Sequence, residues 1–519
     1  MPLLPRFNTL NSIVLIIFTS GLVPVYAESD TLQLYKNNCA ECHGQDRLGS
    51  IGPALLPENL KRVRPKQATA SIRDGLAATQ MPAFGDKLND EEIASLVKYI
   101  YTPLDSIPEW GLEEITQSRI QYFKDEQLSN KPAYSADPLN LFLVVETGDH
   151  HATVLDGDLF EPIHRFKTRH ALHGGPKYSP DGRFVFFVSR DGWISKFDMY
   201  NLKTVAEVRA GINTRNIATS SDGRYVIAAN YLPHTLVIFN TSDLSLLKII
   251  EVKDLAGNSS RVSAVYDAGP RESFIAALKD IPEVWEIPYS DNPPFYGWVH
   301  DYRDEGPPEQ EPFPVRRIEL DDYLDDFFFD QKYEYLIGAA RNSKNGQVVD
   351  LVLGKKDSEL DLPGLPHMGS GITWEYQGKP ILATPNLKDG VVSVIDMNDW
   401  KTIKRIDTQG PGFFMRSHEN TPYAWVDVFF GPNKDVVHII DKATLEIVKT
   451  LKPAPGKTAA HVEFTKDGRY AILSIWENDG AIVIYDAQTL EEIKRLPMKK
   501  PSGKYNVYNK ITRSSGTSH

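Results

Sequence analysis

A repeat that begins near residue 150 constrains the fold of this 519-residue chain more than any other feature. In each unit, an alternating strand rich in β-branched residues ends at an Asp or Asn, a short turn with Leu follows, and a second strand begins. The residues that open these turns are Asp156, Asp198, Asn240, Asp396, Asp441 and Asp486. An Asp-Gly turn before several units, as in "SPDGRFVFFVS" and "TKDGRYAILSI", begins a further strand. Two hairpins in each period of about 40 to 45 residues predict the four-stranded blades of a β-propeller.

The spacing of the repeat predicts the number of blades. The turn residues lie 42 residues apart in the first three units and 45 apart in the last three, with a gap of 156 residues between the two groups. Weaker units at "PEVWEIPYSD" (282–291) and "VVDLVLGKKDSEL" (348–360) fill this gap. The Pro-rich segment 292–315 is expected to be a surface loop between them. Six clear and two weaker units favour eight blades, with seven as the alternative.

A different module precedes the repeat. The only two cysteines of the chain, Cys39 and Cys42, are followed at once by His43 in "CAECH". Cys-x-x-Cys-His is the attachment pattern of a c-type haem, in which both thiols bond to the porphyrin and the histidine ligates the iron. A disulfide or redox-active cysteine pair is the alternative, which the adjacent histidine disfavours. The sequence therefore predicts one covalent haem c and leaves no thiol for a structural disulfide.

Residues 28–108 have the elements of a small all-α cytochrome c domain. Met81 lies 38 residues after His43 in the loop "ATQMPAFGDKL", just before an amphipathic helix predicted at "NDEEIASLVKYIY". Asn89 and Glu92 can form a capping box at the start of that helix. We expect Met81 to be the second axial ligand, a pairing with histidine that gives a fairly positive potential suited to accepting electrons. A packing role for Met81, with a second histidine as ligand, is the alternative.

The first 27 residues have the pattern of a secretory signal peptide. Arg6 supplies a positive charge, "IVLIIF" (13–18) is the apolar region, and "VPVYA" (23–27) offers small residues for cleavage. Export fits covalent haem attachment in a bacterial periplasm, and the apolar run is too short to predict a membrane span in the mature protein. The net charge of −12 argues against nucleic acid and anionic membranes as partners. It leaves small molecules and other redox proteins, including a periplasmic electron acceptor.

The sequence thus divides into a signal peptide (1–27), a cytochrome c domain (28–108), a linker (109–135) and a propeller (136–519). This arrangement resembles the cytochrome cd1 nitrite reductase family over nearly the whole mature chain. The specific points of likeness are "ALHGGPKYSPDGRFVFFVSRDGWISKFD" (171–198), "NTRNIATSSDGRYVIAANYLPHTLVI" (213–238) and "SGKYNVYN" (502–509). The resemblance implies a small all-α domain followed by an all-β eight-bladed propeller whose channel binds haem d1 or dihydro-haem d1.

The family includes nitrite reductases and dihydro-haem d1 dehydrogenases, and its histidine positions help to distinguish them. His173, in "RHALHGGPK", matches the residue that holds the d1 iron on its proximal side in the reductases. His367, in "LPHMGSGITW", matches one of two histidines on the distal face. Where the reductases carry the second, this chain has "FFMRSHENTP", with Arg416 in that place and His418 two residues further on, and the resemblance implies that His418 binds the tetrapyrrole. Nitrite reduction needs two protons delivered to bound nitrite, so an altered distal pair argues against the reductase.

Two further residues match the dehydrogenase instead. His461 in "AAHVEFTKDGRY" and Tyr505 in "GKYNVYN" have counterparts there and not in the reductases. The resemblance implies that His461 takes a proton from the substrate or ligates its iron, that Tyr505 orients the side chain or relays a second proton, and that His367 lies in the same catalytic set. Arg215 and Arg261 are the candidates for binding the carboxylates of the tetrapyrrole. Without the resemblance, a strand-end histidine and a packing tyrosine are the simpler interpretation.

The hypothesis from the sequence is a periplasmic dihydro-haem d1 dehydrogenase. It would oxidise a propionate side chain of dihydro-haem d1 to the acrylate of haem d1 and pass the electrons to haem c. The expected partners are dihydro-haem d1, a periplasmic electron acceptor, nitrite reductase and other haem d1 maturation proteins. A nitrite reductase that forms nitric oxide, and a non-catalytic protein that binds or transfers haem d1, are the alternatives.

Overall fold

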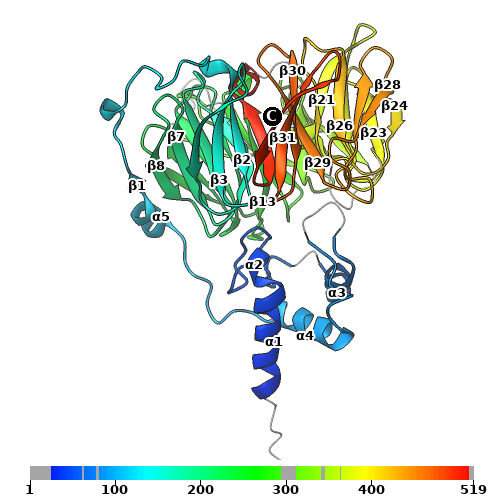
Figure 1. Ribbon diagram of the computed structural model, residues 1–519. Coiled ribbons are helices and arrows are strands. Elements are labelled where there is room, and N and C mark those ends of the chain that lie inside the picture. The colour runs from blue at the N-terminus through cyan, green and yellow to red at the C-terminus, as the bar shows by residue number, and fades with distance from the viewer. Residues whose placement is uncertain are drawn as a thin grey trace, which may run out of the picture.

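The computed structural model describes residues 25–60, 63–76, 81–293, 311–339, 345–362 and 364–512, which form a helical module beside a large ring of β-sheets (Figure 1). The predicted signal peptide up to residue 24 and most of the predicted loop 292–315 lie outside the described residues. Among the helices of the described ranges, none is long and apolar enough to cross a membrane.

The ring consists of eight antiparallel sheets, which we number as blades 1 to 8. From the channel outwards, the first four blades are β33 (Pro501–Asn506), β2 (Leu141–Glu146), β3 (His151–Asp156) and β4 (Pro162–Lys167); β5 (Leu172–Tyr178), β6 (Phe184–Ser189), β7 (Trp193–Asp198) and β8 (Lys203–Arg209); β9 (Asn213–Thr219), β10 (Tyr225–Leu232), β11 (Thr235–Asn240) and β12 (Leu246–Glu251); β13 (Val262–Ala268), β14 (Ser273–Leu278), β15 (Glu283–Pro288) and β16 (Arg316–Glu319). The last four are β17 (Asp326–Phe329), β18 (Tyr335–Ala339), β19 (Gly346–Asp350) and β20 (Lys355–Leu360); β21 (Ile372–Tyr376), β22 (Lys379–Pro385), β23 (Val391–Asp396) and β24 (Lys401–Asp407); β25 (Met415–Arg416), β26 (Tyr423–Asp427), β27 (Val437–Asp441) and β28 (Glu446–Leu451); β29 (Ala459–Phe464), β30 (Tyr470–Ile475), β31 (Gly480–Asp486) and β32 (Glu492–Met498).

The eight-bladed propeller predicted from the repeat is therefore confirmed. The two weaker units of the sequence fall on β15 in blade 4 and on β19 and β20 in blade 5. Both blades are complete four-stranded sheets, although their sequences match the repeat poorly.

Each repeated Asp has a local structural reason. In blade 7 the Asp441 carboxylate accepts hydrogen bonds from the backbone N–H groups of Ala443 and Thr444, at 2.9 and 2.8 Å. Leu445 then takes a left-handed conformation with φ of 58°. This is an Asx turn, in which the short side chain satisfies the backbone groups that the turn leaves unpaired. The repeat is thus a series of turn signals that divide the chain into strands.

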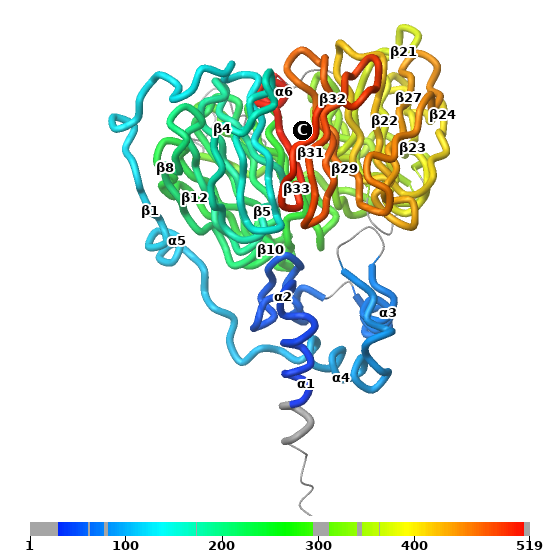
Figure 2. Tube along the Cα trace, viewed as in Figure 1, coloured from blue at the N-terminus to red at the C-terminus, as the bar shows by residue number. Residues whose placement is uncertain are grey.

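The two ends of the ring meet in blade 1. The C-terminal strand β33 pairs with β2, the first strand of the propeller, so that Leu143 lies opposite Tyr505 and Phe142 opposite Asn506. Figure 2 shows the red C-terminal strand between the first and last blades. Backbone hydrogen bonds between the two ends close the ring, and they place Tyr505 on the innermost strand.

The apolar core lies between neighbouring blades. All six residues of β2 are buried, because blades pack on both of its faces, whereas the outer strand β24 alternates between exposed and more buried positions, of which only one is fully buried. One cluster joins Trp425 and Ile439 of blade 7 to Phe464 and Leu473 of blade 8. Similar clusters follow around the ring, so packing alone, with no disulfide, holds the blades together.

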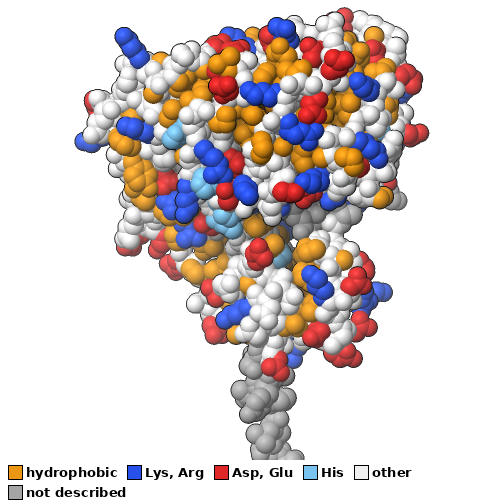
Figure 3. Space-filling model, viewed as in Figure 1, with side chains coloured by type: hydrophobic (Ala, Val, Ile, Leu, Met, Phe, Trp, Pro, Cys, Tyr) orange, Lys and Arg blue, Asp and Glu red, His pale blue; other side chains and the backbone are white. Residues whose placement is uncertain are grey.

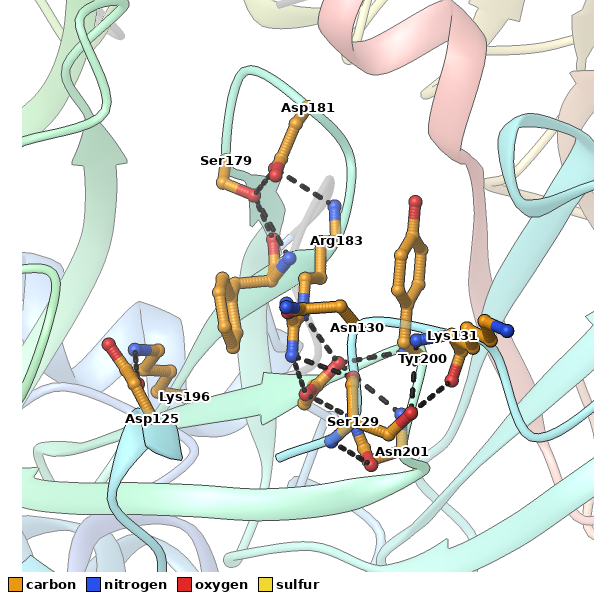
Figure 4. A network of polar contacts seen from close by, with 12 residues as sticks. Asp125, Ser129, Asn130, Lys131, Ser179, Asp181, Arg183, Lys196, Tyr200 and Asn201 are labelled. Carbon is orange, nitrogen blue, oxygen red and sulfur yellow. Dashed lines mark hydrogen bonds and ion pairs between the residues drawn. The ribbon is translucent and has the colours of Figure 1, made fainter. Parts of the chain in front are cut away.

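The segment predicted as a linker is fastened to blade 2. It contains α5 (Leu112–Ser118), β1 (Ile120–Gln121), which adds a fifth strand beside β8, and a short 3-10 helix η1 (Asp125–Gln127). Figure 4 shows how the turn before β6 holds it: the Arg183 guanidinium donates to Asn130 Oδ1 at 2.8 Å and to the Ser129 carbonyl at 3.1 Å. Asn201 donates to the same carbonyl at 2.8 Å. The linker is therefore an ordered strap along the outer edge of the ring.

The helical module contains α1 (Val25–Asn38), α2 (Ala40–His43), α3 (Pro65–Asp74) and α4 (Asp90–Ile100). The predicted capping box at α4 is confirmed, since Glu92 N donates to Asn89 Oδ1 and Asn89 N donates to Glu92 Oε2, both at 2.9 Å. The loop after α2 contacts the propeller near the start of β9. There Leu56 packs with Ile212 and Leu232, and Asn213 donates to the Ser50 carbonyl at 3.2 Å.

The module therefore lies against one open end of the propeller channel (Figure 1). Charged side chains of both signs are scattered over the propeller face seen in Figure 3, so the negative net charge is not gathered there in one patch. The remaining short elements are η2 (Pro138–Asn140), η3 (Gly269–Arg271), η4 (Met368–Ser370) and the C-terminal helix α6 (Val507–Thr512).

Candidate functional site

The predicted haem c motif lies on α2. Cys39 precedes the helix, and Cys42 and His43 are in it. His43 Nδ1 lies 2.8 Å from the Pro53 carbonyl. Because a carbonyl can only accept, Nδ1 carries the proton and Nε2 keeps its electron pair, which is the form that ligates a metal. A Cβ on Gly52 would lie 2.7 Å from His43 Cε1, so this glycine leaves room for the ring.

The rest of the module also fits a haem. Burial is the main cause that raises the pKa of Cys39 to about 11, with Cys42 adding to it, so neither thiol resembles an activated redox cysteine. Cys39 and Met81 are partly buried against one apolar cluster with Tyr35 and Leu88. Two thiols, a correctly protonated histidine and a thioether beside an apolar cluster are the donor set of a c-type haem. The ligand role of Met81 stays a prediction.

The second candidate site is the propeller channel, to which the inner strand of nearly every blade contributes a polar side chain. Burial lowers the pKa of His367, and Arg215 of blade 3 and Arg416 of blade 7 lower it further. Arg215 likewise opposes the rise in the pKa of Tyr266 in blade 4. Charged side chains of different blades thus shift the pKa values of His367 and Tyr266, so these side chains share one channel. Such interactions connect the residues that we call the channel residues, which in blade order are Tyr505, Lys177, Arg215, Tyr266, Asp326, His367, Arg416 and His461.

His461 and Tyr505 meet in this channel. Their ring centroids are 5.2 Å apart with planes at 70°. His461 is 1% exposed, lies in a bulge of β29 and has a φ of 54°. Burial holds its pKa well below the ordinary 6.5, and the neighbouring cations, Lys504 foremost, lower it further. Its imidazole is therefore neutral at pH 7, and Nδ1 has no hydrogen-bond partner among the described residues.

The Tyr505 ring fits between two glycines. A Cβ on Gly175 would lie 3.0 Å from Tyr505 Cε1, and one on Gly503 would lie 2.5 Å from its hydroxyl oxygen. Burial raises the pKa of Tyr505 to about 12, so the hydroxyl keeps its proton at neutral pH. The pair thus combines a neutral base with a hydroxyl that can donate a hydrogen bond.

His367 lies in the loop before η4 on the same side of the channel. Its Nδ1 is 2.5 Å from the Phe413 carbonyl, so Nδ1 carries the proton, and its Nε2 lies 3.8 Å from Asp326 Oδ2. The ring packs on Phe413 with centroids 4.3 Å apart. A set of partly exposed aromatic rings continues from there to His461; it consists of Phe413, Phe414, Phe429, Phe430 and Trp476. Such a rim suits a flat macrocycle, which can stack on ring faces.

The two predicted arginines differ. Arg215 lies in the channel, where it opposes the pKa rise of Tyr266. Arg261 makes a bidentate pair with Asp280, with Nη2–Oδ1 at 2.7 Å and Nε–Oδ2 at 2.8 Å. Its fork is therefore occupied within the protein, which argues against its predicted carboxylate-binding role. Arg190, which the sequence analysis missed, is better placed: burial and then Arg215 lower its pKa to about 9.

His418 is not brought to the channel, contrary to the expectation from the sequence. It lies in the turn between β25 and β26, fully buried, and a Cβ on Gly468 in the adjoining turn of blade 8 would lie 2.3 Å from its Nδ1. That nitrogen accepts a hydrogen bond from Asn420 N at 3.1 Å. Arg416, two residues earlier, occupies the channel instead, because β25 ends at Arg416 and His418 lies in the turn that follows.

Other predicted and missed residues complete the site. The backbone of His173 is in β5, but its side chain lies outside the described part of the structure, so its ligand role stays a prediction. Sequence reasoning missed Asp427, Lys504 and Lys510, which surround His461 and Tyr505. The only signal was the position of Lys504 beside Tyr505, since buried and exposed lysines look alike in a sequence.

Comparison with known proteins agrees with this geometry. The family model described as "Cytochrome D1 heme domain" matches residues 136–510, and that of "Cytochrome C oxidase, cbb3-type, subunit III" matches residues 28–100. The dihydro-heme d1 dehydrogenase of Pseudomonas aeruginosa is 53% identical over 499 residues, which cover 96% of this chain and 98% of that protein. The nitrite reductase of Stutzerimonas stutzeri is 26% identical, with 92% of each chain covered.

A solved structure, "Dihydro-heme d1 dehydrogenase NirN in complex with DHE", matches with a TM-score of 0.77 and 53% identity. The match covers 92% of this chain and 99% of that one. The family model spans the whole propeller, and the most similar of these relatives share both the c-type module and the ring of blades. The chain therefore belongs to the cytochrome D1 heme domain family.

Proposed function

We propose that this chain is a dihydro-haem d1 dehydrogenase, an oxidoreductase that converts a propionate side chain of dihydro-haem d1 to the acrylate of haem d1. The observation that carries the proposal is the contact of neutral His461 with protonated Tyr505 inside the channel. The 53% identity to a dihydro-heme d1 dehydrogenase over nearly the whole chain supports it.

The reaction removes two hydrogens from adjacent carbons. Two C–H bonds break, one carbon–carbon π bond forms, and two protons and two electrons leave the substrate. His461 is the proposed proton acceptor, because its imidazole is neutral, its Nδ1 has no hydrogen-bond partner among the described residues and its ring contacts Tyr505. Tyr505 keeps its own proton and is suited to orient the side chain by hydrogen bonding or to relay the second proton. His367, with its Nε2 left as an acceptor, lies on the same side of the channel.

The aromatic rim and the cations would bind the tetrapyrrole. Its apolar face can stack on the rings near Phe414, and its carboxylates need cationic partners. Arg215, Arg190 and Arg416 would supply that charge, whereas the guanidinium fork of Arg261 is occupied by Asp280. His173 is the proposed ligand of the d1 iron.

Cys39, Cys42, His43 and Met81 would hold a single covalent haem c, which when bound supplies a one-electron acceptor beside the channel. The contact of Asn213 with the Ser50 carbonyl, and the packing of Leu56 on Ile212, keep this module against the propeller. We further propose that the protein works in the periplasm and that its electrons pass to a periplasmic acceptor.

The test is anaerobic mixing of the oxidised holoprotein with dihydro-haem d1. We expect haem c reduction, followed by absorption, and formation of the acrylate product, followed by mass spectrometry, with two electrons recovered for each molecule of product. Binding of dihydro-haem d1 without either change would support a carrier protein instead. Steady consumption of nitrite would support a nitrite reductase, for which the displaced His418 is unfavourable.

A further inference from the structure

The backbone of His461 is held from both sides by buried side chains of the neighbouring blades. Its N–H donates to Asp427 Oδ2 at 3.2 Å, and its carbonyl accepts a hydrogen bond from Lys504 Nζ. Asp427 ends β26 of blade 7, and Lys504 lies on β33 of blade 1. Asp427 is 1% exposed and Lys504 is fully buried. His461 belongs to blade 8, so three successive blades meet at this one residue.

The backbone conformation of His461 explains why these contacts are needed. Its φ of 54° lies in the left-handed region, which is unfavourable for a residue with a side chain. Such a conformation persists only where surrounding groups determine it. The register of β29 shifts here, between Ala460 and Glu463, so the ladder to β30 does not hold His461. The contacts with Asp427 and Lys504 take the place of the missing ladder bonds.

The same carboxylate also reaches the second channel histidine. Asp427 Oδ1 accepts from the backbone N–H groups of Phe413 and Phe414, at 2.7 and 3.0 Å. The Phe413 carbonyl in turn accepts from His367 Nδ1, and the Phe414 ring lies 4.7 Å from the His461 ring. One oxygen of Asp427 therefore fixes the loop that orients His367, while the other fixes the backbone of His461.

We propose that Asp427 is the positioning residue that sets His367 and His461 relative to each other on the substrate, with Lys504 holding the opposite side of His461. Neither residue touches the reacting atoms in this arrangement. They act through the histidines, by fixing the tautomer of one and the backbone conformation of the other. This inference rests on the proposed dehydrogenase function.

Electrostatics agree with a positioning role. Burial raises the pKa of Asp427 to about 6, against the lowering effect of the three backbone N–H groups that it accepts. Burial also lowers the pKa of Lys504 far below its ordinary value. A substitution of Lys504 by Met removes the hydrogen-bond donor to the His461 carbonyl.

The decisive variant is Asp427→Asn in the full-length, haem-loaded protein. The asparagine oxygen can still accept from Phe413 and Phe414, but its NH2 group then faces the N–H of His461. We expect kcat to fall about 10- to 100-fold, as for other groups that orient a catalytic residue, with KM for dihydro-haem d1 changed less than about two-fold. Asp441→Asn is the matched control, because Asp441 caps a turn of the same blade far from the channel and should leave kcat unchanged.

A binding measurement separates positioning from general stability. We expect Asp427→Asn to shift the absorption spectrum of bound dihydro-haem d1 in the same direction as His461→Ala, and to add no further shift in the double variant. An additional shift in the double variant, or a kcat within about two-fold of wild type, would overturn the proposal. If wild-type protein binds but does not oxidise the substrate, the proposed function fails while the spectral comparison still tests the positioning.

A second pair of variants serves if Asp427→Asn does not fold. Lys504 Nζ also donates to Ser474 Oγ at 2.8 Å. Lys504→Met removes both contacts, whereas Ser474→Ala removes only the second. We expect a drop in kcat of about ten-fold or more in Lys504→Met and none in Ser474→Ala. Equal kcat values in the two variants would overturn the proposal that the hydrogen bond from Lys504 to the His461 carbonyl positions His461.

Discussion

The helical module and the propeller channel each fix a functional histidine, but they do so over different distances along the chain. His43 is oriented by the carbonyl of Pro53, ten residues away. His461 is held by Asp427 and Lys504, which lie 34 and 43 residues away on other blades. The first site is local and survives in a sequence motif. The second forms only when the ring is closed, so it depends on the folding of the whole propeller.

The largest expected effect is a loss of substrate oxidation in the channel that leaves the haem c site unchanged. His461→Ala removes the proposed base, and we expect substrate oxidation to fall by about 10²- to 10⁴-fold, the usual contribution of general base catalysis. The haem c absorption spectrum should not change, because the described module residues contact the propeller near the start of β9 and not at blade 8. Single-turnover mixing with dihydro-haem d1 measures the rate. His438→Ala is the control, a buried histidine of blade 7 bonded to Thr450, and wild-type rates in His461→Ala would remove that residue from the mechanism.

A pair of glycine substitutions tests whether the sites fail independently. A Cβ at Gly503 would lie 2.5 Å from the Tyr505 hydroxyl, and one at Gly52 would lie 2.7 Å from the His43 ring. Such overpacking costs about 1 to 3 kcal/mol at the site where it occurs. We expect Gly503→Ala to slow substrate oxidation with normal haem c, and Gly52→Ala to alter the haem c spectrum with normal substrate binding. An altered haem c spectrum in Gly503→Ala would contradict this separation.

The pH dependence should reveal the buried state of His461. Its pKa lies well below 6.5 in the folded protein, whereas in the unfolded chain it returns to that ordinary value. As the pH falls through and below 6.5, the unfolded chain therefore binds the proton first and the free energy of unfolding decreases. Urea titrations across this range should show a weaker decrease in His461→Ala. In wild type, kcat should stay level down to pH 6.5. A loss of kcat above that value would mean that His461 is less buried than in this structure and that its pKa is not lowered.

The smallest expected effect is at His418. Its ring lies in a turn against Gly468 and not in the channel. We expect His418→Gln to change kcat and KM less than about two-fold, and to lower the free energy of unfolding by about 1 to 3 kcal/mol because a buried polar residue is altered. Steady-state kinetics and urea denaturation measure the two quantities. A ten-fold loss of kcat would instead mean that His418 reaches the substrate.

Much of the fold could be predicted because its signals are local. The Asp at each turn, such as Asp441 with its two backbone contacts, marks where the chain reverses. The same holds for the capping box of Asn89 and for the haem motif around His43. Blades 4 and 5 match the repeat poorly, so their complete four-stranded sheets are established by the structure.

The candidate site was predictable only in part. The sequence and the family resemblance pointed to His461, Tyr505 and His367, and the structure brings all three to the channel. They could not tell that Arg261 is paired with Asp280, since that pair joins the residue before β13 to a residue after β14, which no motif records.

The sequence by itself determined the repeat, the haem c attachment motif and the presence of a histidine and a tyrosine in unusual places. Only the tertiary structure decided which side chains share the channel and in what protonation state. The reason is physical: a pKa and an orientation depend on burial and on partners from other blades. For His461 these partners, Asp427 and Lys504, come together only when β33 closes the ring.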